Sequence, residues 1–160
     1  MPAQNLIDLS HPSITAEAQE FLSKPHRLLI GGEWVESQSG ERRKVFDPAT
    51  GLVISEVADG SQADVEKAVI AARKSFDSGA WRKLSGSEKS KVLWRIGELI
   101  DKYSHELAEL EVLDEGSPYG VVKNAYVRNS AEHFRYYSGW CTKLNGLSVP
   151  VGLPGEWHAY

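Results

Sequence analysis

The sequence predicts an α/β protein in which a small antiparallel β unit is followed by three helices and the first part of a β ribbon. Two changes of pattern along the chain predict this fold class. Up to about residue 60, short β-like runs alternate with turns that contain Gly or Pro. From residue 61 to residue 146, apolar residues recur at the three- and four-residue spacing of helices. Residues 147–160 return to short apolar runs separated by Gly and Pro.

Residues 1–27 are expected to form an N-terminal arm and a short helix. Pro2 and Pro12 lie in a stretch with little periodicity, which favours an irregular arm. The helix would follow Ser13 and end before Pro25, because the residue that precedes a proline disfavours helical backbone.

Short strands are predicted in the segments that follow. The segment 26–35 (HRLLIGGEWV) places Gly31-Gly32 between two β-like runs, a pattern that is typical of a hairpin. Residues 44–47 and 53–57 are predicted to form two further strands, because a turn sequence, PATG, separates them.

The first helix of the middle region is predicted to begin at a capping box, with Ser61 as N-cap and Asp64 three residues later. We expect it to end near Gly79, because glycine readily adopts the left-handed backbone that ends many helices. Its apolar stripe consists of Val65, Ala68, Val69, Ala72 and Phe76.

Two more helices are predicted. The second begins near Ser87 and ends at Gly116, and its stripe, continued by one turn, reaches the carboxylate of Asp114. The third has Ser117 as N-cap and Pro118 at its first position. The stripe predicted for this third helix consists of Val122, Ala125, Tyr126, Asn129, His133, Tyr136, Tyr137, Trp140 and Leu144, after which Asn145-Gly146 ends it.

Residues 147–160 are predicted to form a strand, a turn and the beginning of a second strand. The sequence holds no further segment that could pair with this last strand, so we expect an open sheet edge there. The open edge indicates that the chain stops within a domain.

Composition narrows the classes of partner and location. The formal net charge is −4 at pH 7. A protein with this overall charge is not attracted electrostatically to nucleic acids or to anionic membranes. The single Cys excludes an internal disulfide and a zinc site with several cysteines, and it fits a cytoplasmic location. The chain has neither a secretory signal nor an apolar stretch of the roughly 20 residues that a membrane span needs.

Polar residues on predicted apolar stripes are the candidates for a site. A buried carboxylate is costly unless it is paired, so Asp114 either contacts the start of the next helix or binds a cation. Asn129 and His133 either are hydrogen-bonded core groups or line a ligand cavity. Trp94 and Trp140 are expected in the core.

Cys141 is not predicted to be a nucleophile. It lies near the end of a predicted helix, whereas reactive thiolates favour helix N-termini or cationic neighbours, and only Lys143 is close. We expect a small, half-buried residue. The sequence also has no nucleophile elbow, no paired-histidine metal motif and no glycine-rich phosphate loop. The residues alone therefore yield no catalytic constellation.

Five segments, taken in order and with their spacing, resemble the N-terminal portion of the NAD(P)-dependent aldehyde dehydrogenase superfamily. Within the family, residues 13–27 and the sequence FDPATG are similar to those of the phenylacetaldehyde-type bacterial members. The segments are LLIGGEWVES (28–37), VFDPATGLVISEVADGSQADVEKAVIAARKSF (45–76), WRKLSGSEKSKVLWRIGELI (81–100), LAELEVLDEGSPY (107–119) and FRYYSGWCTKLNGLSVPV (134–151).

The resemblance implies a division of the chain. Residues 28–146 would be the N-terminal part of the dinucleotide-binding domain, and residues 147–160 would begin the oligomerisation ribbon, which pairs across subunits. The family's nucleophilic Cys, general-base Glu and oxyanion-hole Asn lie further along, and this sequence holds none of their motifs. No catalytic or cofactor-binding residue is therefore expected in this chain.

Two site assignments follow from the resemblance. A monovalent cation would bind between the backbone carbonyl of Phe46 and the carboxylate of Asp114. The helix from Pro118 to Leu144 resembles the one that walls the family's aldehyde tunnel, and Ala125 and Asn129 would face that tunnel.

The function that the resemblance implies is oxidation of an aldehyde to a carboxylic acid with NAD or NADP. The full-length enzyme would be a cytoplasmic homo-oligomer, a dimer or a tetramer, and the 160 residues alone would be an inactive fragment with exposed apolar surfaces. The alternative is a non-catalytic remnant or an oligomerisation module that joins other subunits through the ribbon.

Overall fold

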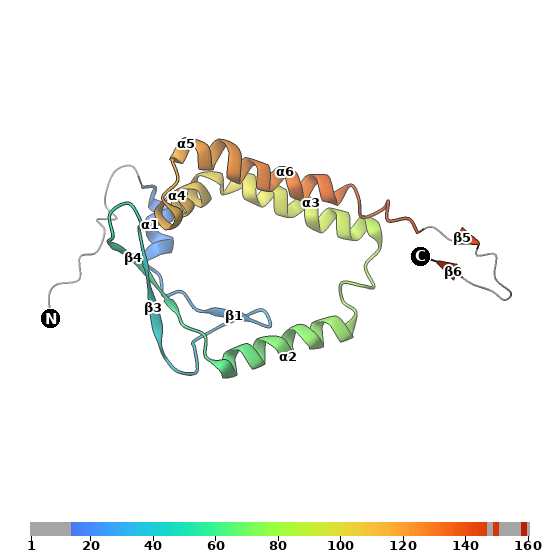
Figure 1. Cartoon of the computed structure of the whole chain (residues 1–160), viewed down its shortest axis with the longest axis horizontal. Helices are drawn as coiled ribbons and strands as arrows, with labels where there is room; N and C mark the ends of the chain where they lie inside the picture. Colours follow the sequence, from blue (N-terminus) through green and yellow to red (C-terminus); the bar gives the residue numbers. More distant parts are fainter. Residues whose placement is uncertain (1–13, 147–148, 151–157, 160) are drawn as a thin grey trace.

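The computed structural model describes residues 14–146, 149–150 and 158–159, so the predicted arm lies outside the described residues. Two β-hairpins and the first helix gather at one end of the molecule, and longer helices extend away from them (Figure 1). The predicted α/β class is confirmed. Within the described residues, no helix is long and apolar enough to cross a membrane.

Helix α1 spans Ala16–Ser23 and is capped by Thr15, whose side-chain oxygen accepts a hydrogen bond from the backbone N–H of Ala18. The helix therefore begins later than the sequence predicted, because the hydroxyl that caps it is two residues further along than Ser13. Its end at Lys24, directly before Pro25, is as predicted.

The two predicted hairpins are confirmed. Strands β1 (Leu28–Ile30) and β2 (Glu33–Val35) are antiparallel, and Gly31 and Gly32 between them have φ values of 63° and 91°. A two-residue turn with both φ values positive suits glycine, which has no Cβ to clash with the backbone.

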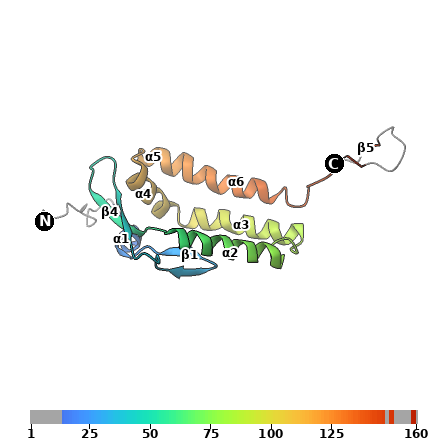
Figure 2. The ribbon, with the colours of Figure 1, turned by 60° about the horizontal axis from the view of Figure 1, so that its bottom comes forward.

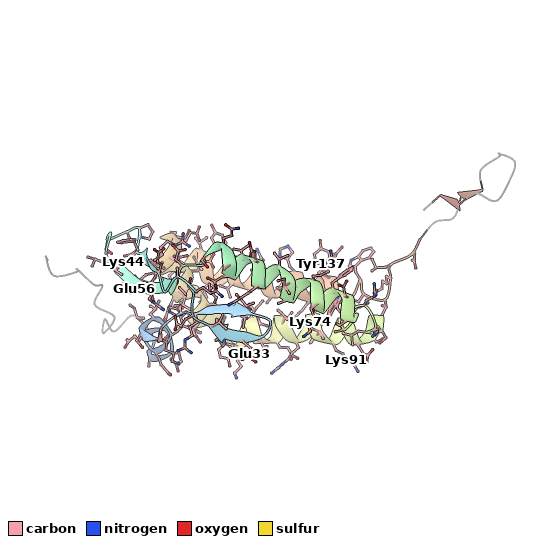
Figure 3. The ribbon with its side chains drawn as sticks, turned by 90° about the horizontal axis from the view of Figure 1, so that it is seen from below. Glu33, Lys44, Glu56, Lys74, Lys91 and Tyr137 are labelled. Atoms are coloured by element: carbon pink, nitrogen blue, oxygen red, sulfur yellow. The ribbon has the colours of Figure 1, made fainter. Side chains whose placement is uncertain are left out.

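Strands β3 (Arg42–Phe46) and β4 (Val53–Ala58) form the second antiparallel hairpin. Lys44 lies directly opposite Glu56 in it, and Figure 3 shows the two side chains at the same end of the molecule. A register shift falls between Val45 and Phe46, at the end of β3.

Helix α2 (Gln62–Ser78) has the predicted capping box and ends at Gly79, whose φ is 70°. It contacts the β1–β2 turn, where a Cβ on Gly31 would lie 3.6 Å from the Cβ of Ala71, and its Asp64 accepts hydrogen bonds from Ser37 and Gln38. The predicted apolar stripe is exposed over most of its length: Val65, Val69 and Phe76 are 57–64% exposed.

The second predicted helix is two helices in the structure. Helix α3 (Gly86–Lys102) is capped by Ser85, not Ser87, through a capping box with Glu88. Tyr103, with φ −101° and ψ 20°, interrupts the helical backbone, and α4 (Ser104–Glu115) follows in a different direction (Figure 1). The break carries no Gly or Pro, so local sequence did not predict it, and the expected set of three helices was wrong.

The third predicted helix contains a π turn. Helix α5 (Tyr119–Val121), the π-helix η1 (Val122–Val127) and α6 (Arg128–Ser138) follow one another without a break. The helix ends at Gly139 rather than at Asn145. Ser117 does not cap it, because its hydroxyl donates a hydrogen bond to Oε1 of Glu115 at 3.0 Å.

The π turn changes which face of this helix is buried. Val122 and Val127 are both buried although they are five residues apart, and Ala131 and Ser138 continue the buried face. A π turn holds one more residue than an α turn. Positions counted from Val122 at the spacing of an α-helix therefore fall on the exposed face of α6 instead of its buried face. Four residues of the predicted stripe are therefore exposed: Asn129, His133, Tyr136 and Tyr137.

Helices α3 and α6 pack side by side and antiparallel (Figures 1 and 2). Gly97 is the buried residue of α3, and a Cβ there would lie 3.0 Å from the backbone oxygen of Ala131. The guanidinium of Arg135 forms an ion pair with Asp101 and lies 5.8 Å from the centre of the Trp94 ring. Trp94 and Trp140 are 49% and 46% exposed, so the prediction that both are core residues was wrong.

A small apolar cluster joins α4 to the π turn. Ala108, Val122 and Val127 are its buried members, and Ile100 and Val112 pack against it. This cluster fixes the position of α5 and η1 over α4, and with them the start of α6.

Strands β5 (Val149–Pro150) and β6 (His158–Ala159) are antiparallel and lie beyond the end of α6 (Figure 1). The two predicted strands pair with each other in a sheet of two strands, so the second edge of β6 is open among the described residues. The turn predicted between them lies outside the described residues.

Candidate functional site

The outer face of α6 forms a shallow hollow of about 600 Å³ that includes one of the predicted tunnel residues. Asn129 and His133 lie one turn apart along its floor, and Tyr136 and Tyr137 follow on the next turn. All four are exposed, so the alternative in which Asn129 and His133 are hydrogen-bonded core groups was wrong, and the cavity alternative remains.

Ala125 lies four residues before Asn129, within the π turn, and is half-buried. It does not line the hollow, which begins at Asn129. The two predicted tunnel residues therefore follow one another along the helix, but only Asn129 contributes to the hollow of the described residues.

A larger cleft of about 670 Å³ lies between α1, the β3–β4 hairpin and α4. Apolar side chains such as Leu22, Ile54 and Leu110 form its interior. Three carboxylates of α4 line it as well, at the three- and four-residue spacing that places side chains on one helix face: Glu111, Asp114 and Glu115.

The two residues predicted to hold a cation lie at this cleft or beside it. Asp114 lines the cleft and is exposed rather than buried, and the contact at the start of the next helix comes from Glu115, not from Asp114. Phe46 ends β3 at the register shift, directly after Val45, which lines the cleft. The end of α4 approaches the turn after β3, where a Cβ on Gly116 would lie 2.9 Å from the ring of Pro48.

The carboxylates of α4 offer oxygen ligands at this cleft. Hard cations take carboxylate and carbonyl oxygens, and a register shift in a strand pair disrupts the ladder of backbone hydrogen bonds. Among the described residues, no group of three or more His, Cys, Asp or Glu side chains is arranged to hold a metal ion. Any cation site would therefore depend on backbone carbonyls beside Asp114.

His26 also lines the cleft, and the sequence did not single it out. Burial lowers the pKa of its imidazole, and the nearby guanidinium of Arg42 lowers it further. His26 is held in place by its backbone, whose carbonyl accepts hydrogen bonds from the N–H of Ala58 and from Arg42. The imidazole is thus biased toward its neutral form at the wall of the cleft.

Tyr137 was named as part of an apolar stripe but not as part of a site. Figure 3 shows its side chain at the outer edge of the helical layer, and it is 58% exposed. Its backbone oxygen accepts a contact of 3.6 Å from the thiol of Cys141, which is half-buried as the sequence predicted. A helical register that included the π turn would have grouped Tyr137 with Asn129 on the outside.

Comparison with known proteins identifies the family. Residues 34–159 match the model of the aldehyde dehydrogenase family. The chain is 47% identical over 125 residues to aldehyde dehydrogenase family 2 member B4, mitochondrial, from Arabidopsis thaliana, and covers 23% of that protein. It is 40% identical over 137 residues to phenylacetaldehyde dehydrogenase from Pseudomonas fluorescens, of which it covers 27%.

A solved structure gives the same result. The NAD+ complex of an aldehyde dehydrogenase from Bacillus cereus superimposes with a TM-score of 0.82 at 33% identity, covering 87% of this chain and 28% of that one. The chain thus spans about a quarter of the length of the curated relatives it matches, within the N-terminal part of their fold. On this evidence, the chain belongs to the aldehyde dehydrogenase family.

Proposed function

We propose that this chain is the N-terminal part of an enzyme that oxidises an aldehyde to a carboxylic acid with NAD or NADP. The observation that carries the proposal is the match of residues 34–159 to the family model. In such an enzyme, residues 28–146 contribute the N-terminal part of the dinucleotide-binding domain, and residues 147–160 begin the oligomerisation ribbon.

Ala125 and Asn129 form part of the wall along which the aldehyde enters. The exposed position of Asn129 in an open hollow supports this assignment, because a tunnel wall must present its side chains to a space that a small molecule can occupy. The small side chain of Ala125 and the polar one of Asn129 leave that wall unobstructed by bulky aliphatic groups.

A monovalent cation binds beside Asp114 and the backbone carbonyl of Phe46. The exposed carboxylate at the cleft, the register shift at Phe46 and the approach of α4 to Pro48 support this assignment. The ion would neutralise part of the negative charge of α4, where Glu111, Asp114 and Glu115 share one face.

The partners of the full-length enzyme are its aldehyde substrate, the nicotinamide cofactor and further copies of itself. The pairing of β5 with β6 supports a ribbon at residues 147–160, through which a dimer or tetramer would assemble. A reducing, cytoplasmic location agrees with a single cysteine in 160 residues.

The test is an assay of NADH or NADPH formation with several aldehydes. The purified 160-residue chain should give none, whereas a chimera should turn over when the chain replaces the matching N-terminal part of the Bacillus cereus aldehyde dehydrogenase. Turnover by the 160 residues alone would overturn their assignment as an incomplete enzyme. A folded, oligomeric but inactive chimera would favour the second candidate, a non-catalytic module that joins subunits through the ribbon.

A further inference from the structure

A polar cluster of three side chains lies where α5 and η1 pack over α4 (Figure 1). The Nζ atom of Lys123 lies 2.9 Å from Nε2 and 3.2 Å from Nδ1 of His105, and the hydroxyl of Tyr119 lies 3.1 Å from the same Nδ1. Ala108, one turn after His105, and Val122, next to Lys123, are both buried in the apolar cluster that joins α4 to η1. That apolar contact holds the three polar side chains together.

The hydrogen-bonding groups of this polar cluster determine where its protons lie. An ammonium group only donates hydrogen bonds, so the imidazole of His105 accepts one from Lys123 at Nε2. Nδ1 then carries the ring hydrogen and donates it to the oxygen of Tyr119, whose own hydrogen can point at a further group. Lys123, His105 and Tyr119 therefore form a continuous path for protons.

Lys123 differs from other lysines of the chain in its surroundings. It is half-buried, and its ammonium contacts an imidazole, the side chain that most often accepts protons near neutral pH. Among the described residues, Lys24 is instead ion-paired with Glu20 at 2.6 Å, and Lys102 contacts the hydroxyl of Tyr103 at 3.2 Å. An amine beside a general base is the arrangement that makes lysine a nucleophile toward carbonyl carbon.

Space for a reacting group lies directly beside Lys123. Gly120 precedes it by one turn of the helix, and apart from the helix backbone nothing would lie within 4 Å of a Cβ on Gly120. Residues three apart on a helix are neighbours on its surface, so the open space over Gly120 adjoins the Lys123 side chain. A small carbonyl compound can thus reach Nζ.

We propose that Lys123 forms a covalent imine with aldehydes, and that His105 and Tyr119 transfer the protons of this reaction. The ammonium first gives one proton to solvent through His105. The neutral amine then attacks the carbonyl carbon, so that a C–N bond forms as the C=O double bond opens. The two hydrogens left on the nitrogen pass in turn, by way of the imidazole and the Tyr119 hydroxyl, to the carbonyl oxygen, which departs as water. The step needs no oxidant or reductant, and water reverses it.

This inference is separate from the proposed function. The imine needs only residues of α4, α5 and η1 and no nicotinamide cofactor, whereas oxidation of the aldehyde depends on groups beyond this chain. An inactive chimera that still forms the imine at Lys123 would count against the enzymatic function alone. An active chimera that does not form it would count against this inference alone.

Reductive trapping tests the proposal on the chimera with the Bacillus cereus aldehyde dehydrogenase. The chimera is incubated with propanal and sodium cyanoborohydride at pH 8, without NAD or NADP, so that each imine becomes a stable propylamine. A protease that cleaves after Glu then releases Lys123 within residues 116–132 and Lys102 within residues 99–106, each as the sole lysine of its peptide. Mass spectrometry should show that Lys123 is propylated about ten-fold faster than Lys102, and that the two rates become equal in urea.

Lys102 is the matched control, because it also lies beside a tyrosine hydroxyl and ring but has no imidazole neighbour among the described residues. His105→Ala should bring the rate at Lys123 close to that at Lys102. Free imidazole in the buffer should restore most of the Lys123 rate in this variant without changing the Lys102 rate, a response that a merely structural role of His105 would not give.

Equal rates at the two lysines of the folded chimera would overturn the proposal. A Lys123 rate that His105→Ala leaves unchanged, or a loss that imidazole does not restore, would overturn the role of His105. The same trapping is run on the 160-residue chain, because labelling is read at each lysine and does not require a monomer. A chimera that does not assemble therefore leaves the test in place.

Discussion

Val122 and Val127 are buried on the same side of one helix although five residues separate them. An α-helix returns to the same side after three or four residues, so the backbone between these valines must hold one extra residue. The π turn supplies it. As a result, the seam continues through Ala131 and Ser138, and the face that carries Asn129 and His133 turns outward.

Deleting one residue inside the π turn should therefore be tolerated better than deleting one after it. Removal of the exposed Asn124 leaves Val122 and Val127 four apart, which suits an ordinary α-helix. Removal of the exposed Ser130 instead turns Ala131 and Ser138 by about 100° around the helix axis relative to Val122 and Val127, so the buried face of α6 no longer continues that of the π turn. Urea unfolding followed by circular dichroism measures both, and equal midpoints for the two deletions would contradict the assignment.

Close packing of α3 on α6 predicts that Gly97→Ala is destabilising. The new methyl would lie 3.0 Å from the backbone oxygen of Ala131 and 3.2 Å from Cγ of Arg135, so the helices must move apart. Overpacking of this kind costs about 1–3 kcal/mol. Gly120→Ala is the matched control, because nothing lies within 4 Å of its added Cβ and alanine favours the helix by up to ~1 kcal/mol. A higher urea midpoint for Gly97→Ala than for Gly120→Ala would refute the packing argument.

Local signals predicted one part of the fold and long-range contacts decided the other. The Ser61–Asp64 capping box and the Gly31-Gly32 turn depend on neighbours in sequence, and both are confirmed. The break at Tyr103 and the π turn carry no Gly or Pro, and they serve the packing of α4 against α1 and η1. The spacing of apolar residues within one helix does not reveal contacts between different helices.

The candidate site was predicted in the same uneven way. Asn129 was named because polar residues on a predicted apolar stripe are unusual, but its exposure could not follow from a register that lacked the π turn. Asp114 was placed on a buried face because the stripe of α3 was continued past Tyr103, whereas the break there lets α4 leave Asp114 exposed at the cleft.

Hydrogen bonds between Thr15 and Glu109 hold α1 to α4. The carboxylate of Glu109 accepts hydrogen bonds from the backbone N–H of Thr15 at 3.0 Å and from its hydroxyl at 2.6 Å. Thr15→Ala removes the hydroxyl bond and the N-cap, which together cost about 1–3 kcal/mol. Hydrogen exchange of α1 should accelerate, while Thr15→Ser, which keeps the hydroxyl, should restore its protection. Unchanged exchange in Thr15→Ala would show that α1 is held by its apolar contacts alone.

Asp64 makes the stability of the chain depend on pH below 4. Hydrogen bonds from the side chain and backbone of Ser61 lower the pKa of this carboxyl from 3.8 to about 2, and Ser37 donates to it at 2.9 Å. The folded state therefore binds the proton more weakly than the unfolded state, and stability is full above pH 4 and falls as pH drops toward 2. Asp64→Asn should lower the urea midpoint at pH 7 and flatten this acid dependence. Asp77→Asn, at the exposed end of α2, is the control, and an identical acid profile for both variants would remove Asp64 as the cause.

The exposed stripe of α2 predicts that the 160 residues are poorly soluble by themselves. Val65, Val69 and Phe76 are 57%, 62% and 64% exposed along one face of this helix. Contiguous apolar surface of this kind binds dyes and promotes association. We expect strong fluorescence with anilinonaphthalene sulfonate, early elution in size exclusion, and a broad thermal transition.

Changing Val69→Glu should weaken dye binding and shift elution toward the monomer, because it places a charge in the middle of that stripe. Ser75→Glu adds the same charge at another exposed position of α2 and serves as the control for solubility gained from net charge alone. If both variants shift elution equally toward the monomer, the net charge of the chain rather than the apolar stripe limits its solubility. A sharp two-state thermal transition of the unmodified chain would contradict the prediction outright, because it requires a core that packs without further partners.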